Sequence, residues 1–310
     1  MKILLYNLYF NRIYSIYDVL GIAQVEEGPE IFTTDRRLFH EVDAVVFNLP
    51  HLVFHLKENV SKPAGQIWVG WNLECERNYP FLLSEELHTL IDIWMTYHPD
   101  SDVPIPYLND TFPSRIQDAP PASGLKDVCM FISSPVNHSR RIEYLAELMK
   151  QIKIDSYGRL FHNTDLPGDT GYRSKQKILS QYKFTIAFEN ARYPDYVTEK
   201  FYDPLLAGSV PVYLGAPNID AFSPGRSAFV HVDDYADPAA LAAVLREYCT
   251  GKSLDCFYRW KGLPLNDRLL QITACQQIPP FERLIKKIEQ FQPKEKPSTS
   301  IRIGNGRLSG

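Results

Sequence analysis

Short apolar runs rich in β-branched and aromatic residues recur along the chain and predict buried strands. They lie at residues 3–6, 44–47, 67–71, 93–97, 128–133, 184–188, 210–214 and 228–232. Ser139 to Ile152 instead places apolar residues at three- and four-residue steps, which is the spacing of an amphipathic helix. Asp237 followed by Pro238 has the signature of a helix N-terminus. Strands that alternate with helices predict parallel sheets covered on both faces, and therefore an α/β fold.

A segment rich in proline, serine and glycine divides this pattern into two strand-bearing halves. The pattern predicts an N-terminal domain at residues 1–112, a linker at residues 113–126 and a C-terminal domain at residues 127–291. The remaining residues, 292–310, are polar and rich in proline, serine and glycine. We expect them to form a mobile tail, because such a composition lacks the apolar side chains needed for a core.

The balance of charge argues against a generally basic nucleic-acid-binding protein. The 310 residues carry 33 Lys and Arg against 37 Asp and Glu, a net charge of −4. Residues 283–310 hold seven basic and two acidic side chains, a net charge of +5, which leaves −9 on residues 1–282. A basic end on an acidic body favours an acidic partner or a membrane surface.

The basic end contains a predicted amphipathic helix, FERLIKKIEQF. Phe281, Leu284, Ile285 and Ile288 form its apolar side, and basic residues surround them. This pattern suits either docking against the body of the protein or weak peripheral contact with an anionic membrane. Docking is favoured because the stretch is short.

Targeting signals and cysteine usage predict a cytoplasmic protein, with peripheral membrane contact as the alternative. We find no run of about 18–20 apolar residues that could span a bilayer, and the first residues lack a small-residue cleavage site. Five cysteines, odd in number and widely spaced, contain no C-x-x-C pair. This usage predicts reduced thiols rather than a disulfide framework.

The chemistry is concentrated in residues 182–235, where a predicted strand leads through a loop into a helix starting at Thr198. Loops after the carboxyl ends of parallel strands are where open α/β sheets bind ligands. Glu199 and Lys200 fall in the first helical turn, where free N–H groups and the helix dipole favour an anion such as a diphosphate. Glu199 suits the hydroxyls of a ribose, although it could equally serve only to complement the dipole.

Several motifs in this region resemble those of one family. FENARYPDYVTEK at residues 188–200 resembles the signature of the α-1,3-fucosyltransferases of glycosyltransferase family ten, and VPVYLG and FVHVDDY follow it as in that family. Upstream, WNLE, DSDVPIPY and IDSYGR resemble further family segments in the same order. The resemblance extends from about residue 67 to 262.

The resemblance implies a GT-B fold, in which two Rossmann-like domains face a cleft and the C-terminal domain holds GDP-fucose. The family's donor-binding positions correspond to Arg140, Tyr157, Asn190, Tyr196, Glu199 and Lys200. Glu199 is then expected to bind the ribose, Lys200 and Arg140 the diphosphate, and Tyr157 the base. Arg141 is adjacent to Arg140 and remains an alternative phosphate ligand.

The resemblance also implies inverting transfer of L-fucose from GDP-β-L-fucose to a hydroxyl, O3 foremost, of an N-acetylglucosamine or glucose unit. N-acetyllactosamine is such an acceptor. The reaction needs a base that takes the proton of the acceptor hydroxyl. By resemblance this base is Glu74 in WNLECE. Glu76 points the same way if the segment is extended, so it is the competing candidate.

Other functions remain open at this point. Asp100-Ser101-Asp102 is formally a D-x-D motif, which supports a metal-dependent GT-A enzyme as the rival. The resemblance instead implies that no metal is required, although a divalent ion could stimulate the reaction, and that Arg140 and Lys200 supply the positive charge. A transferase with another donor or linkage is a second alternative. A carbohydrate-binding protein without turnover is a third.

Overall fold

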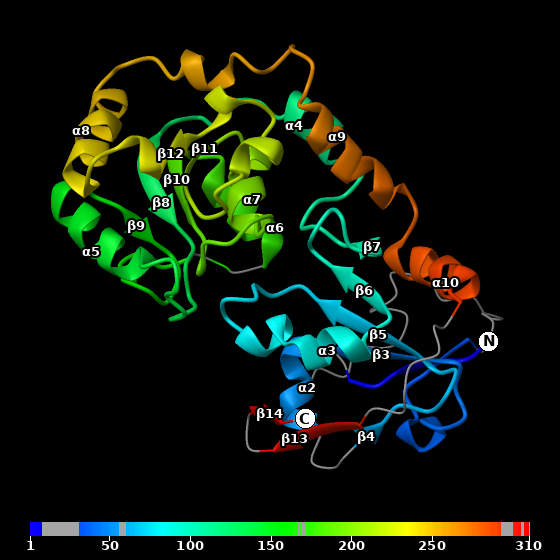
Figure 1. Ribbon diagram of the computed structural model, residues 1–310. Coiled ribbons are helices and arrows are strands. Elements are labelled where there is room, and N and C mark those ends of the chain that lie inside the picture. Colours follow the sequence, from blue (N-terminus) through cyan, green and yellow to red (C-terminus); the bar gives the residue numbers. More distant parts are fainter. Residues whose placement is uncertain are drawn as a thin grey trace. The chain divides into compact units, whose positions relative to one another are not determined.

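The computed structural model describes residues 1–7, 31–55, 60–166, 168, 171–292, 300–304 and 307–309. The chain forms two compact units, each with its own sheet and core (Figure 1). Unit 1 combines Met1–Pro106 with Gln276–Gly310, and unit 2 comprises Tyr107–Cys275. The chain therefore leaves unit 1 once and returns to it for its last segment.

Unit 1 is built on a six-stranded, wholly parallel sheet with the order β2-β1-β3-β5-β6-β7. Its strands are β1 (Ile3–Leu5), β2 (Phe32–Thr33), β3 (Ala44–Asn48), β5 (Ile67–Asn72), β6 (Ile93–Thr96) and β7 (Val103–Pro104). The helical elements are η2 (Arg36–Leu38), α2 (Leu49–His55), η3 (Pro80–Leu83), α3 (Glu85–Leu90) and α10 (Pro280–Gln290).

The side chains of these strands pack alternately into two cores, because successive side chains of a strand point to opposite faces of the sheet. On one face the sheet packs against α10, whose Phe281, Leu284 and Ile288 are buried. On the other face it packs against residues of α2 and α3, among them Leu52 and Leu87. The period-two alternation thus places helices on both faces, as the sequence predicts.

A small antiparallel sheet in unit 1 includes part of the segment that the sequence predicts as a mobile tail. Its strands are β4 (Val60–Ser61), β13 (Ser300–Gly304) and β14 (Arg307–Ser309), in the order β14-β13-β4. In Ser300–Gly304, two isoleucines alternate with polar residues, which is a strand period that the overall composition of the tail conceals. Residues 293–299, 305, 306 and 310 of the predicted tail lie outside the described residues.

Unit 2 is built on a five-stranded parallel sheet with the order β12-β11-β10-β8-β9. Its strands are β8 (Lys126–Met130), β9 (Asp155–Ser156), β10 (Tyr182–Phe188), β11 (Val210–Leu214) and β12 (Val230–His231). The chain starts inside the sheet at β8, adds β9 on one side, and then crosses to β10 on the other. This reversal makes the carboxyl ends of β8 and β10 a topological switch point, where open α/β sheets bind ligands.

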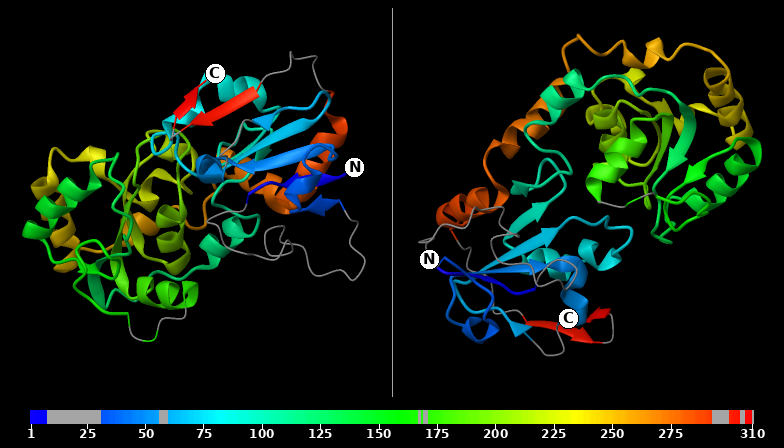
Figure 2. Two further views of the ribbon diagram at one scale, coloured as in Figure 1. Left: turned by 90° about the horizontal axis from the view of Figure 1, so that it is seen from below. Right: turned by 180° about the vertical axis from the view of Figure 1, so that it is seen from behind.

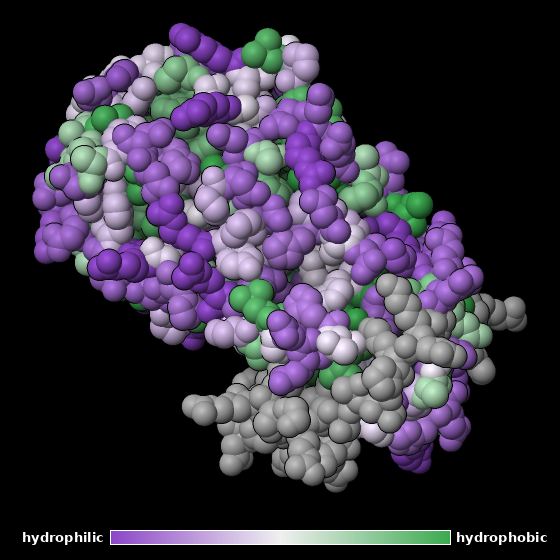
Figure 3. Space-filling model, viewed as in Figure 1, coloured by the Kyte–Doolittle hydropathy of each residue, from purple (hydrophilic) through white to green (hydrophobic). Residues whose placement is uncertain are grey.

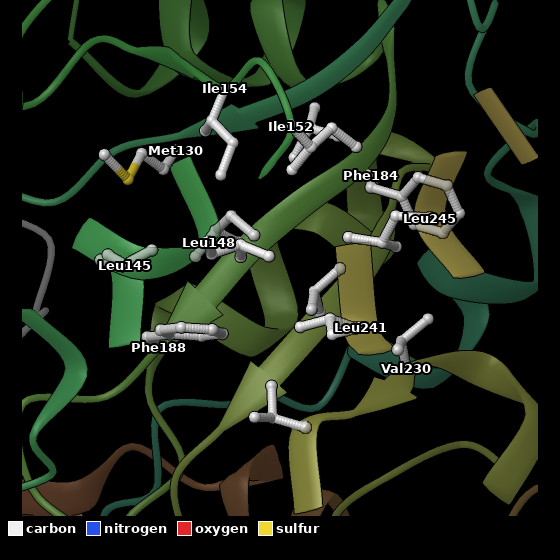
Figure 4. Close-up of a cluster of buried hydrophobic side chains, with 14 of the residues drawn as sticks. Met130, Leu145, Leu148, Ile152, Ile154, Phe184, Phe188, Val230, Leu241 and Leu245 are labelled. Atoms are coloured by element: carbon white, nitrogen blue, oxygen red, sulfur yellow. The ribbon is translucent and has the colours of Figure 1, made fainter. Parts of the chain in front are cut away.

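Helices cover both faces of the unit 2 sheet (Figure 2). The helices are α4 (Phe112–Asp118), α5 (Arg141–Gln151), α6 (Tyr172–Leu179), α7 (Glu199–Ala207), α8 (Pro238–Cys249) and α9 (Asp267–Ala274). Short turns of 3₁₀-helix are η4 (Ile219–Ala221), η5 (Arg226–Ala228), η6 (Val232–Asp234), η7 (Asp255–Tyr258) and η8 (Cys275–Gln277). Figure 4 shows leucines of α5 and α8 converging on Phe184 and Phe188 of β10.

The end of α7 requires a glycine. Gly208 caps the helix with φ +76°, a left-handed backbone conformation that residues other than glycine rarely adopt. A Cβ at this position would lie 1.9 Å from the carbonyl oxygen of Pro120. Glycine is therefore the residue that fits at this position.

The predicted domain boundaries differ from the two units in two places. The predicted linker contains most of α4, which has a proline in its first turn and buries Phe112 and Ile116 in the core of unit 2. Helix α10 lies inside the predicted C-terminal domain, yet its apolar side completes the core of unit 1. That burial confirms docking of the basic helix against the body.

The outer surface is mostly polar on the face seen in Figure 3, where apolar residues are scattered among hydrophilic ones. Within the described part of the chain, no helix has the length and apolar content needed to cross a membrane. The five cysteines all lie in the described residues, and none of them forms a disulfide there.

Candidate active site

The switch point of unit 2 brings together the loops that follow β8 and β10. Ser139, from the loop after β8, donates from Oγ to the carbonyl oxygen of Glu189 at 2.6 Å. Its backbone N–H donates to the carbonyl oxygen of Asn190 at 3.0 Å. These two hydrogen bonds fix the end of β10 against the segment that leads into α5.

Glu189 is a fully buried carboxylate at the end of β10. It accepts hydrogen bonds from the backbone N–H of Thr198 at 2.8 Å and from the Thr198 hydroxyl at 2.9 Å. Lys200 Nζ lies 3.5 Å from its second oxygen. Burial raises the pKa of Glu189, and the Lys200 charge opposes that rise. Glu189 therefore connects the end of β10 to the start of α7.

The first turn of α7 combines a cation and a carboxylate with the N-terminus of the helix. Thr198 is the N-cap, as the sequence predicts, and its side chain accepts from the N–H of Lys200. Lys200 Nζ lies 3.0 Å from Oε1 of Glu199, and 46% of the Glu199 side chain is exposed against 19% of Lys200. An anion placed here would meet the positive end of the helix dipole together with the ammonium group.

The charges of this turn hold one another in the ionised state. Burial opposes the charge of Lys200, but Glu189 and Glu199 outweigh it and raise the pKa of Lys200. Burial likewise opposes ionisation of Glu199, but Lys200 and Lys175 outweigh it and lower the pKa of Glu199. The site thus keeps both a cation and an acceptor for hydroxyl groups.

Two adjacent arginines at the start of α5 have opposite environments. Arg140 is the N-cap, is exposed, and adopts a left-handed conformation with φ +60°. Arg141 is fully buried and donates to the carbonyl oxygens of Phe188 at 2.9 Å and Ser134 at 2.8 Å.

Arg141, rather than the predicted Arg140, belongs to the charged cluster. Burial lowers the pKa of Arg141, while the neighbouring Glu189, Tyr196 and Glu199 act in the opposite direction. Its buried Nε has no hydrogen-bond partner within the described residues. The physical reason for the difference is the helix start, because the N-cap conformation of Arg140 leaves its side chain in solvent.

The loop between β10 and α7 buries Tyr196, which is 3% exposed and packs edge-to-face on Tyr107 with ring centroids 6.3 Å apart. The preceding Asp195 has φ +65°. Its N–H and carboxylate pair with the side-chain amide of Asn218 at 2.9 and 2.8 Å, which stabilises this uncommon conformation. The predicted residues Asn190 and Tyr196 thus lie in one loop fixed at both ends.

Tyr157 lies after β9 and stacks on Phe131 of the loop after β8, with centroids 4.9 Å apart and an interplanar angle of 12°. Its hydroxyl is 2.9 Å from that of Tyr182. The following residue, Gly158, passes so close that a Cβ would lie 2.1 Å from the carbonyl oxygen of Ile132. Only glycine fits there.

Sequence reasoning missed the pair that supports the cluster from α6. Lys175 Nζ donates to Asp203 at 2.6 Å and lies 6.0 Å from the centre of the Phe131 ring. Its charge also acts on Glu199. Lys175 and Asp203 are 28 residues apart on two different helices, so no local pattern could have paired them.

In unit 1, Glu74 follows β5 and its backbone is fixed by Asn72. Asn72 Nδ2 donates to the carbonyl oxygen of Glu74 at 2.8 Å, and the Glu74 N–H donates to Asn72 Oδ1 at 2.9 Å. Glu74 is half-buried, whereas Glu76 is 7% exposed. Glu76 accepts from the Tyr97 hydroxyl, from His98 Nε2 at 3.2 Å and from Asn72 Nδ2 at 3.3 Å.

More polar side chains lie at the carboxyl ends of the neighbouring strands of unit 1. Asn7 Nδ2 donates to the carbonyl oxygen of Asn48 at 2.7 Å, and the Asn48 N–H donates to Asn7 Oδ1 at 2.9 Å. His51 Nδ1 lies 2.9 Å from Asn48 Oδ1. Since β1, β3 and β5 are adjacent and parallel, this pair lies on the same edge of the sheet as Asn72.

The D-x-D segment supports the fold of unit 1. Asp102 accepts from the backbone N–H of Trp94 at 2.9 Å, and its other oxygen lies 2.9 Å from Lys287 Nζ of α10. Over the described ranges, no group of three or more His, Cys, Asp or Glu side chains is arranged to hold a metal ion. Asp102 thus ties the segment before β7 to β6 and to α10.

Comparison with known proteins finds the same family over both units. Residues 2–108 match "Fucosyltransferase, N-terminal", and residues 122–300 match "Glycosyltransferase family 10 (fucosyltransferase) C-term". The 3-galactosyl-N-acetylglucosaminide 4-alpha-L-fucosyltransferase FUT3 of Pan troglodytes is 35% identical, over 69% of this chain and 58% of that protein. The human 4-galactosyl-N-acetylglucosaminide 3-alpha-L-fucosyltransferase 9 is 32% identical, over 74% and 63% respectively. The chain thus spans about three fifths of these relatives.

Solved structures show the same fold. A crystal structure of an alpha1,3-fucosyltransferase has a TM-score of 0.59, with 16% identity over 94% of this chain and 90% of that chain. A structure described as alpha1,3-fucosyltransferase with GDP has a TM-score of 0.57 at the same identity. These likenesses confirm the predicted α/β fold with two Rossmann-like units, the GT-B class.

Proposed function

The chain belongs to glycosyltransferase family 10, the fucosyltransferases, and from this membership we propose that it transfers L-fucose from GDP-β-L-fucose to a glycan. The proposed acceptor is a hydroxyl, O3 foremost, of an N-acetylglucosamine or glucose unit, as in N-acetyllactosamine. The transfer inverts the anomeric centre and forms an α-linkage. The observation that carries this proposal is the charged first turn of α7 at the switch point of unit 2.

The donor site is proposed at that turn. Lys200 and the positive end of the α7 helix dipole would attract the diphosphate, and Arg141 would add a second cation from the start of α5. The half-exposed carboxylate of Glu199 would accept hydrogen bonds from the ribose hydroxyls. As the bond to fucose breaks, negative charge develops on the departing GDP, and these fixed cations would stabilise it.

The base is proposed to be Glu74. Its carboxylate would take the proton from the acceptor hydroxyl as that oxygen attacks the anomeric carbon from the face opposite GDP. Glu76 is less suited to this task, because it is buried and already accepts from Tyr97, His98 and Asn72. The structure thereby favours Glu74 between the two candidates.

The names of two relatives support the proposed acceptor hydroxyl. One relative is a 4-fucosyltransferase for a 3-galactosyl acceptor, and another is a 3-fucosyltransferase for a 4-galactosyl acceptor. In each name, galactose and fucose occupy the 3- and 4-positions of the same N-acetylglucosamine unit, in opposite order. For a 4-galactosyl acceptor such as N-acetyllactosamine, the proposed product therefore carries fucose on O3, which linkage analysis of the product would test.

The decisive experiment measures GDP release and product formation with GDP-fucose, with and without N-acetyllactosamine. Glu74→Gln is expected to lower turnover by about 10²-fold or more, the range typical of a lost general base, while GDP affinity stays unchanged. The matched control is Glu86→Gln, an exposed carboxylate on α3 of the same unit, which should keep full activity.

Three outcomes would contradict the proposal. Near-normal turnover in Glu74→Gln would exclude this base. We also propose that no metal is required, because Lys200 and Arg141 supply the positive charge. Wild-type activity should then persist in EDTA, and a complete loss that manganese restores would favour the metal-dependent alternative. GDP-fucose that binds without any transfer across a panel of acceptors would favour a carbohydrate-binding protein.

A further inference from the structure

We propose that Glu76 is a positioning residue for Glu74, acting through the side-chain amide of Asn72. Tyr97 and His98 hold Glu76 in place for this task. The inference rests on the proposed function, because it assumes that Glu74 is the base. It assigns a role to a buried carboxylate that the transfer mechanism itself does not use.

The first step is the pair of hydrogen bonds by which the Asn72 side chain holds the backbone of Glu74. The amide accepts from the Glu74 N–H at 2.9 Å and donates to the Glu74 carbonyl oxygen at 2.8 Å. The peptide groups on both sides of the Glu74 Cα are therefore held by one side chain. This restricts the direction in which the Glu74 carboxylate leaves the backbone, and a base must be held close to its productive geometry.

The second step is the orientation of the Asn72 amide. An amide can rotate by half a turn and exchange its oxygen and nitrogen, and only its partners decide between the two states. Glu76 Oε1 lies 3.3 Å from Asn72 Nδ2. A carboxylate only accepts hydrogen bonds, so it favours the NH₂ group on its side. The amide oxygen is then directed to the Glu74 N–H, and a rotated amide would lose all three bonds.

The third step is the fixation of Glu76 itself. Its carboxylate is buried, and burial of an unpaired charge is unfavourable. The Tyr97 hydroxyl donates to Oε2, and His98 Nε2 lies 3.2 Å from Oε1. The rings of Tyr97 and His98 stack with centroids 4.2 Å apart, which holds both donors at the end of β6. The strand β6 thus supports the turn that follows its neighbour β5.

The test begins with the conservative variant Glu76→Gln. The amide side chain keeps the shape of Glu76, but it lacks the negative charge that accepts from Asn72 Nδ2 and can present an NH₂ group to it, which weakens the hold on the Asn72 amide. We expect kcat for transfer to N-acetyllactosamine to fall about 10- to 100-fold, the scale for a misplaced catalytic group, while GDP affinity changes less than about twofold. The control is again Glu86→Gln, which makes the same chemical change outside this network.

The dependence of kcat on pH separates a positioning residue from a base. If Glu74 is the base, the acid limb of the profile persists in Glu76→Gln at a lower plateau. If Glu76 were the base, its replacement would abolish that limb, and the inference would be overturned.

A double-mutant cycle tests whether Glu76 acts through Asn72. Asn72→Ala alone should lower kcat at least as much as Glu76→Gln, and the double variant should lose little more than Asn72→Ala. Losses that simply multiply would show that Glu76 acts by another route and would overturn the inference. Should Glu76→Gln fail to fold, Tyr97→Phe removes one donor to the same carboxylate and is expected to lower kcat in the same direction, with Asn72→Ala again masking the effect.

Failure of this inference is distinguishable from failure of the proposed function. If Glu74→Gln still transfers fucose at a near-normal rate, the proposed base and the inference fall together. If Glu74→Gln is inactive but Glu76→Gln transfers at the wild-type rate, the inference alone is overturned.

Discussion

At the end of β10, a single residue shows how a buried charge can serve a binding site. Glu189 has no exposure to solvent. Its charge is stabilised by hydrogen bonds from the N–H and the hydroxyl of Thr198 and by the nearby Lys200. Removal of a single partner would leave a buried charge partly unpaired, which is strongly unfavourable. The same contacts place Thr198 at the N-cap of α7, so fold and site depend on one carboxylate.

The pKa of Lys200 is raised, so this lysine stays charged near neutral pH. We therefore expect that its titration does not affect the affinity for GDP in that range. Its folded-state pKa lies above the ordinary 10.5, so the charge and its contribution to stability are fully present below that value and are lost only at higher pH. We expect the affinity for GDP, measured by calorimetry, to stay constant from about pH 7 to 9. A loss of affinity with a midpoint near pH 8 would contradict this.

Lys200→Met supplies the matching test by substitution. It should weaken GDP binding by about 10- to 100-fold, the scale of one or two hydrogen bonds from a charged group. Lys177→Met on α6 is the control, because Lys177 is exposed on the same unit.

At the scale of elements, the sequence predicted the strands and helices whose apolar residues recur with a regular period. It missed most of the strands that have only two residues. The five-residue β11 and the N-caps of α7 and α8 were predicted at the residues where they occur. Strands of two residues, such as β7 and β9, are too short to show alternation. The site divides in the same way. The residues around α7 could be found from the predicted helix start and from their resemblance to a family motif, but the contacts of Glu76 with Tyr97 and His98 join residues more than 20 positions apart.

The start of α5 shows the same limit within one helix. Adjacent helical residues differ in direction by about 100°, so the sequence implies that Arg140 and Arg141 face different surroundings. It does not say which of them is buried. The structure buries Arg141 and leaves Arg140 in a left-handed N-cap, a result that depends on where the helix begins.

These surroundings predict different outcomes for the two arginines. Arg140→Gly should leave GDP affinity within about twofold and leave the free energy of unfolding unchanged or up to about 1 kcal/mol higher, because glycine adopts φ +60° without strain. Arg141→Lys should weaken GDP binding about 10-fold and lower stability, since lysine cannot donate to two carbonyl oxygens in the same fixed geometry. A large loss of affinity in Arg140→Gly alone would restore Arg140 as the phosphate ligand.

At the scale of the whole molecule, the basic C-terminal segment is explained in part by unit 1 itself. Lys287 pairs with Asp102 at 2.9 Å, and Arg283 donates to the carbonyl oxygen of Pro104 at 2.7 Å. Both contacts attach α10 to the end of the sheet near β7. The apolar side of α10 is buried beneath them, so the excess of positive charge surrounds a helix that is part of a core.

Leu284→Ala tests this assignment for the molecule as a whole. Leu284 is fully buried between α10 and the sheet of unit 1, so its truncation should lower the free energy of unfolding by about 2–5 kcal/mol. Affinity for GDP should persist while the protein is folded, because the proposed donor residues all belong to unit 2. Leu270→Ala on α9, where the leucine is 40% exposed, is the matched control and should change stability far less. A change within about 0.5 kcal/mol in Leu284→Ala would show that α10 does not complete the core, and sedimentation with anionic vesicles would then decide whether its basic face binds a membrane.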